Sequence, residues 1–85
     1  MPLSEGDCKD LREALAGKAT GYRYSNVARW LRAAGFVEHG AGGSHRTWRH
    51  ASGVRIPMVD KGKGHLLPVY VKRAARGIFG TGECG

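Results

Sequence analysis

The spacing of apolar residues changes twice along the chain, and this change limits the folds that the sequence can adopt. Over residues 25–35, apolar side chains recur at intervals of three and four, which is typical of an amphipathic helix. Over residues 36–59 the interval becomes two, as in strands that bury one face. From residue 67 onward the helical interval returns. The sequence therefore predicts an α+β fold with strands between two helices.

Each of three expected helices carries a signal at both ends. A capping box is predicted where Ser4 is followed three residues later by Asp7. A glycine is expected to end each of the three helices, and a proline is expected to begin the last one. The expected limits are Ser4 and Gly17 for the first helix, Ser25 and Gly35 for the second, and Pro68 and Gly77 for the third.

Three strands are expected between the second and third helices, over residues 36–39, 44–50 and 54–59. The last two are separated by a short turn that contains glycine, so they should form a hairpin. Within the middle strand, alternation places His45 and Arg49 on the face opposite Trp48, which we expect in the core. Pro57 lacks an amide donor and indicates an edge strand.

The order of elements over residues 25–78 is α-β-β-β-α, a three-stranded antiparallel sheet with helices on one face. This is the layout of double-stranded-RNA-binding domains, and it leaves one sheet face open to solvent. The 85 residues are enough for one domain and not for two. We expect an added N-terminal helix and connection over residues 1–21, a core over 22–79 and a flexible tail over 80–85.

Positive charge is concentrated in the C-terminal half of the chain. The net charge is +7, and residues 44–76 contain eight basic residues but one acid, Asp60. Such an excess predicts a polyanionic partner such as nucleic acid, with a solvated basic face as the alternative. Tyr70 lies off the apolar stripe of the last helix, so we expect it to be exposed and able to stack on a base.

His45 follows a glycine-rich segment at the start of a strand, where a phosphodiester can approach closely. Its imidazole can transfer a proton at neutral pH, as RNA cleavage by attack of the 2′-hydroxyl requires. The alternative is an ordinary exposed histidine on a basic strand. Nearby basic residues could neutralise charge at the transition state, and His65 or Lys63 could carry the second proton. The expected RNA-binding residues are Gly43, Ser44, Arg46, Arg49, Lys61, Lys63 and His65.

Other functions are less well supported by the sequence. The spacing of the four histidines matches no compact zinc pattern, so we expect no metal and no cofactor. No run of about 18 apolar residues exists, and residues 1–6 lack the pattern of a secretory signal, so we expect no membrane partner and a cytoplasmic location. Cys8 and Cys84 could form a terminal disulfide, but two cysteines without a signal peptide fit a reducing compartment better, with Cys8 as a packing residue.

Four segments, taken in order, resemble the HicA toxins of bacterial toxin–antitoxin systems. They are residues 30–36 ending in Gly35-Phe36, residues 43–50 beginning with Gly43-Ser44-His45, residues 54–57 ending in Pro57, and Leu67-Pro68. The resemblance covers about residues 24–78. The residues after Pro57 depart from the family pattern of proline, a basic residue and histidine, and the last helix is rich in alanine instead of leucine.

The resemblance implies metal-independent cleavage of mRNA, with His45 at the position of the family's catalytic histidine. It also implies a fold like that of double-stranded-RNA-binding domains and neutralisation by a HicB antitoxin. Our leading hypothesis is therefore a toxin with endoribonuclease activity whose partners are mRNA and a HicB-like protein. The alternative is an RNA-binding module of the same fold that does not cleave.

Overall fold

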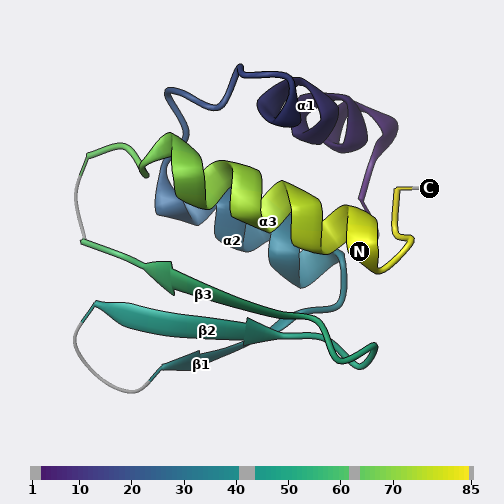
Figure 1. The fold of residues 1–85 in the computed structure, drawn as a ribbon, viewed down its shortest axis with the longest axis vertical. Coiled ribbons are helices and arrows are strands. Elements are labelled where there is room, and N and C mark those ends of the chain that lie inside the picture. The colour runs from purple at the N-terminus through teal and green to yellow at the C-terminus, as the bar shows by residue number, and fades with distance from the viewer. Residues whose placement is uncertain (1–2, 41–43, 62–63, 85) are drawn as a thin grey trace.

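The computed structural model describes residues 3–40, 44–61 and 64–84, which form three helices and one three-stranded sheet (Figure 1). The α-β-β-β-α order expected from the sequence is confirmed, preceded by the added N-terminal helix. The elements are α1 (Glu5–Leu15), α2 (Tyr24–Ala33), β1 (Val37–Gly40), β2 (His45–Arg49), β3 (Arg55–Val59) and α3 (Pro68–Gly80).

The sheet is antiparallel with the strand order β1-β2-β3. Its register pairs Glu38 with Trp48 on one side and Trp48 with Ile56 on the other. Because residues that pair directly across strands share a face, these three side chains all point toward the helices. β3 is an edge strand, as Pro57 predicted.

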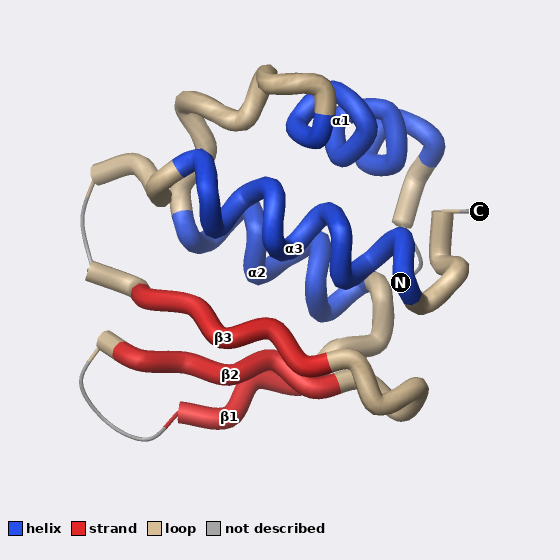
Figure 2. The backbone as a smooth tube through the Cα atoms, viewed as in Figure 1, coloured by secondary structure: helices blue, strands red, loops and turns tan. Residues whose placement is uncertain are grey.

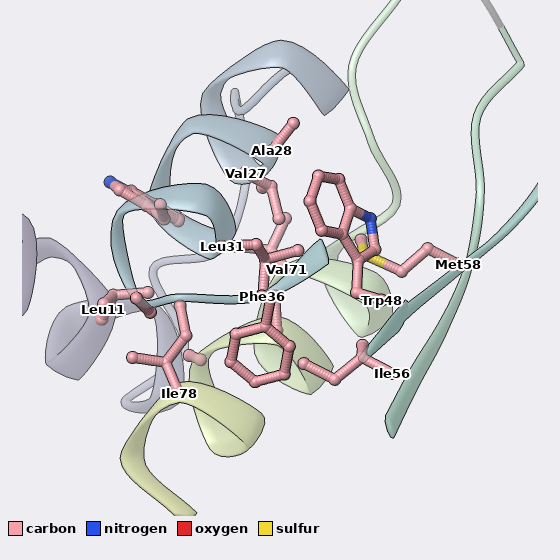
Figure 3. Close-up of a cluster of buried hydrophobic side chains, with 14 of the residues drawn as sticks. Leu11, Val27, Ala28, Leu31, Phe36, Trp48, Ile56, Met58, Val71 and Ile78 are labelled. Atoms are coloured by element: carbon pink, nitrogen blue, oxygen red, sulfur yellow. The ribbon is translucent and has the colours of Figure 1, made fainter. Parts of the chain in front are cut away.

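All three helices lie on one side of the sheet, and the other side has no helix over it (Figure 2). α2 and α3 cover the sheet, and α1 packs against α3 on the side away from the strands (Figure 1). The core extends from the sheet, where the side chains of Trp48 and Ile56 lie, through α2 and α3 to Leu11 of α1 (Figure 3). Trp48 is fully buried, as expected.

The helix starts agree with the sequence at α1 but not at α2. Ser4 caps α1, because its hydroxyl accepts from the Asp7 amide at 3.0 Å and the Asp7 carboxylate accepts from the Ser4 amide. The expectation that Ser25 caps α2 is wrong. Arg23 is the N-cap, and the Asn26 side chain accepts from its amide at 3.0 Å. The N-cap therefore lies two residues before Ser25, and Asn26, three residues after Arg23, satisfies the Arg23 amide.

The expectation that α3 stops at Gly77 is also wrong, since the helix continues to Gly80. Gly77 lies where α3 crosses β3, and a β-carbon there would come within 2.8 Å of Ile56 Cγ1 and closer still to its Cδ1. The glycine therefore permits a close approach between helix and strand and does not end the helix.

α1 and the C-terminal segment are joined covalently, whereas the sequence favoured two reduced thiols and a fraying tail. Cys8 and Cys84 form a disulfide with 5.7 Å between their Cα atoms. Arg29 of α2 adds a second tie to α1, through an ion pair of 2.9 Å with Asp7. The hydrogen bond from Arg29 is the largest cause that lowers the pKa of Asp7 to about 2.

Candidate nucleic-acid interface

His45, the predicted catalytic residue, is the first residue of β2, and its side chain is exposed. Trp48, three residues further along the same strand, is buried beneath the helices. Since side chains alternate along a strand, His45 points to the sheet face without a helix. We call this the open face. Its residues within the described strands are Val37, His39, His45, Thr47, Arg49, Arg55, Pro57 and Val59.

His39 is a second histidine on the open face, and sequence reasoning missed it. The register pairs His39 of β1 with Thr47 of β2, and Thr47 lies two residues from His45 on the same face. The two histidines are therefore diagonal neighbours on adjacent strands, a relation in which Cα atoms lie about 7–8 Å apart. Both side chains are exposed. Alternation alone could place each histidine on a face, but only the register brings them together.

Two arginines lie further along the open face. Arg49 of β2 pairs directly with Arg55 of β3, and both are exposed. Like charges directly opposite each other destabilise a sheet unless an anion lies between them. No acidic residue of the described strands shares this face, because the carboxylate of Glu38 lies on the helix side. The open face therefore combines two imidazoles with uncompensated positive charge.

A cavity of about 640 Å³ lies on the other side of the sheet, between the N-terminal half of α2, the strands and the segment that leads into α3. Its acidic lining residues are Glu38 and Asp60. Its basic lining residues are Arg23, Arg32, Arg46, Lys61 and His65. Tyr70 also lines the cavity and is half-buried, not fully exposed as expected.

The lining of the cavity includes a connected set of polar side chains. Trp48 donates from Nε1 to the Tyr24 hydroxyl at 3.0 Å, and that hydroxyl donates to Glu38 at 2.5 Å. Glu38 also lies 3.5 Å from Arg32 and 3.6 Å from Arg46. Burial, followed by the hydrogen bond to Glu38, raises the pKa of Tyr24 far above its ordinary value. The Tyr24 hydroxyl therefore keeps its proton and donates it in the hydrogen bond to Glu38.

The structure divides the predicted RNA-binding residues between two surfaces. Arg49 joins His45 on the open face, whereas Arg46, Lys61 and His65 line the cavity. Ser44 lies at the sheet end, where its carbonyl accepts from the Asp60 amide at 2.7 Å. Gly43 and Lys63 lie outside the described residues. The expected single surface is therefore divided between the two faces of the sheet, and Arg49 lies at the far end of β2 from His45.

The described part of the chain holds neither a metal-binding cluster nor a membrane-spanning helix. Within residues 3–40, 44–61 and 64–84, no three side chains of histidine, cysteine, aspartate or glutamate come close enough to share a metal ion. Over the same residues, no helix has both the length and the apolar character needed to cross a bilayer.

Comparisons with known proteins do not extend the resemblance noted in the sequence. No family model matches the chain, and no match is found among curated proteins or solved structures. Function is therefore inferred from the residues and their geometry, and the resemblance to HicA toxins stays a prediction.

Proposed function

We propose that the chain is an endoribonuclease that cleaves mRNA without a metal ion, and that it is the toxin of a bacterial toxin–antitoxin pair. The observation that carries the proposal is the exposure of His45 on the open face, beside a second histidine and on the same face as Arg49 and Arg55. A buried His45 would have ruled out contact with a phosphodiester. The resemblance to HicA toxins points to the same residue.

The cleavage needs two proton transfers, and His45 and His39 supply them. One imidazole removes the proton of the 2′-hydroxyl, and the 2′-oxygen then attacks the adjacent phosphorus. The other imidazolium protonates the departing 5′-oxygen, so that a 2′,3′-cyclic phosphate and a 5′-hydroxyl end are formed. Such groups typically contribute about 10²- to 10⁴-fold each. His39 replaces His65 as the second proton carrier, because His65 lines the cavity behind the sheet.

Positive charge on the open face attracts the RNA strand to the surface that carries His45. Arg49 lies on the same strand face as His45 at a separation of four residues. Arg55 pairs with Arg49 and extends the positive surface to the sheet edge. These two arginines bind flanking phosphates of the RNA.

The partner of such a toxin is an antitoxin of the HicB kind, which must keep RNA from His45. An acidic surface that covers the open face would do so by pairing with Arg49 and Arg55. In this arrangement the antitoxin competes with RNA for the same arginines, so substitution of either one weakens both interactions.

The test is cleavage of labelled single-stranded RNA by the purified protein in the presence of a chelator. We expect 2′,3′-cyclic phosphate products from the wild type and a loss of about 10²- to 10⁴-fold in His45→Ala. His39→Gln should remove one limb of a bell-shaped pH–rate profile while leaving the other. Arg76→Ala, an exposed change on α3 outside both surfaces, serves as the control.

Two results would refute the assignment. Undiminished cleavage by His45→Ala would show that His45 takes no part in the proton transfers. An unchanged pH–rate profile in His39→Gln would show the same for His39. RNA binding without any cleavage product, equally strong in His45→Ala, would identify the non-catalytic RNA-binding module instead. Induction of the same variants in bacterial cells gives a second measurement, because growth arrest and transcript shortening should disappear together in His45→Ala.

A further inference from the structure

We propose that the cavity behind the sheet binds one nucleotide of the RNA, with its phosphate at Arg23 and Lys61 and its base against Tyr70. The inference rests on the proposed RNA-cleaving function and adds a binding subsite to it. The ligand class is a nucleoside monophosphate unit, either within RNA or free. The volume of the cavity, its basic residues and its apolar and aromatic lining each support a nucleotide as the ligand.

The cavity has the size and the wall of a ligand site. Its volume of about 640 Å³ falls inside the 300–1,000 Å³ that is usual for small-molecule and cofactor sites. Ala28, Leu66 and Tyr70 provide apolar and aromatic lining. The guanidinium of Arg73 lies 5.2 Å from the centre of the Tyr70 ring and also donates to the Pro57 carbonyl at 3.1 Å, so the ring is supported from β3. A planar base is the ligand group that such a wall accommodates.

Two of the cations in the lining are available for a phosphate. Arg32 and Arg46 are engaged by Glu38, at 3.5 and 3.6 Å. Within the described ranges of the chain, Arg23 and Lys61 form no ion pair with an acidic residue. Both are exposed, so they can reach an anion at the mouth of the cavity without a desolvation penalty. A phosphate is therefore favoured there over a neutral ligand.

The cavity also has a fixed position relative to the proposed catalytic residue. Arg46 lines it, and His45 is the preceding residue of β2, with its side chain on the open face. RNA whose base occupies the cavity passes around the end of the sheet and presents a neighbouring phosphodiester to His45. The subsite thus fixes which bond is cleaved and gives the cleavage a base preference.

Calorimetric titration with the four nucleoside 3′-monophosphates and with inorganic phosphate tests the inference. We expect at least one monophosphate to bind about tenfold or more tightly than phosphate. Lys61→Glu should weaken monophosphate binding by about tenfold, whereas the matched reversal Arg76→Glu, outside the cavity, should not. Tyr70→Leu should weaken it by about 5- to 150-fold and Tyr70→Phe should preserve it. Circular dichroism establishes that each variant is folded.

Three outcomes would overturn the inference: no binding of any monophosphate, equal affinity for phosphate and monophosphates, or equal losses in Lys61→Glu and Arg76→Glu. His45→Ala separates this inference from the proposed function. If it abolishes cleavage while monophosphates fail to bind the wild type, the cavity inference alone is wrong. If it cleaves normally while monophosphates bind as described, the assignment of His45 is wrong and the subsite remains.

Discussion

Breaking the disulfide between Cys8 and Cys84 should lower the stability of the whole domain, because the bond closes nearly the entire chain. The two residues are separated by 76 positions. A crosslink removes conformations from the unfolded chain, and the number that it removes grows with the length of the closed loop. Reduction returns that freedom to the unfolded state and leaves the sheet and its two covering helices with the same contacts.

The magnitude follows from the loop length. With the chain-entropy relation, closing a loop of this size stabilises the folded state by about 4.5 kcal/mol at 25 °C, near the upper end of the 2–5 kcal/mol that removal of a native disulfide typically costs. Small domains have a total stability of about 5–15 kcal/mol. A loss of about 2–4.5 kcal/mol corresponds to a fall in Tm on the order of 10–30 °C for a domain of this length.

Thermal unfolding followed by circular dichroism, with and without a thiol reductant, measures this effect. The double variant Cys8→Ser/Cys84→Ser is the control: it should unfold at the lower temperature and show no response to reductant. If the oxidised and reduced wild-type proteins unfold within about 2 °C of each other, the loop-closure argument is refuted. A response of the double variant to reductant would show that the shift has another origin.

Two further predictions concern packing and pH. Gly77→Ala should lower the free energy of unfolding, measured in urea, by about 1–2 kcal/mol, because overpacking against Ile56 outweighs a gain in helix propensity of about 1 kcal/mol. Adding Ile56→Val to this variant should recover part of the loss. Gly80→Ala is the control and should not destabilise the protein, because its added atom meets open space. The lowered pKa of Asp7 means that its ionised form stabilises the fold above about pH 4 and that this contribution is lost as the pH falls from about 4 to 2. Asp7→Asn should therefore be less stable by at most about 1 kcal/mol at pH 7, since its arginine partner is exposed, and the difference should shrink as the pH falls through about 2. A difference at pH 2 as large as that at pH 7 would contradict this.

The layers of the fold follow from local patterns in the sequence. The change of apolar spacing placed the second helix, the three strands and the last helix within a few residues of their observed limits. The capping box of α1 needs only Ser4 and Asp7, which are neighbours in the chain. The left-handed turn after α2 needs Gly35, whose φ is 92°. Features of this kind are decided by residues within one turn of each other.

Other features depend on segments that are distant in sequence. A glycine at position 77 is typical of the end of a helix, but Gly77 lies against the Ile56 side chain of β3. No local sequence pattern reveals this contact. The disulfide forms because α1 packs against α3 and so lies beside the segment that follows α3. Composition alone favoured two reduced cysteines. The pairing of His39 with the strand that carries His45 depends on register, which joins residues of two different strands.

The register is also what makes His45 accessible, and the core fixes that register. A slip of one residue along β2 would move every side chain to the other face, which would bury His45 and expose Trp48. Trp48 is fully buried and donates to the Tyr24 hydroxyl at 3.0 Å. Such a slip would expose the indole to water and break this hydrogen bond. Burial of one large side chain is worth about 1.5–3 kcal/mol. The same indole that fills the core therefore holds the candidate catalytic imidazole on the open face, although the two side chains lie on opposite sides of the sheet.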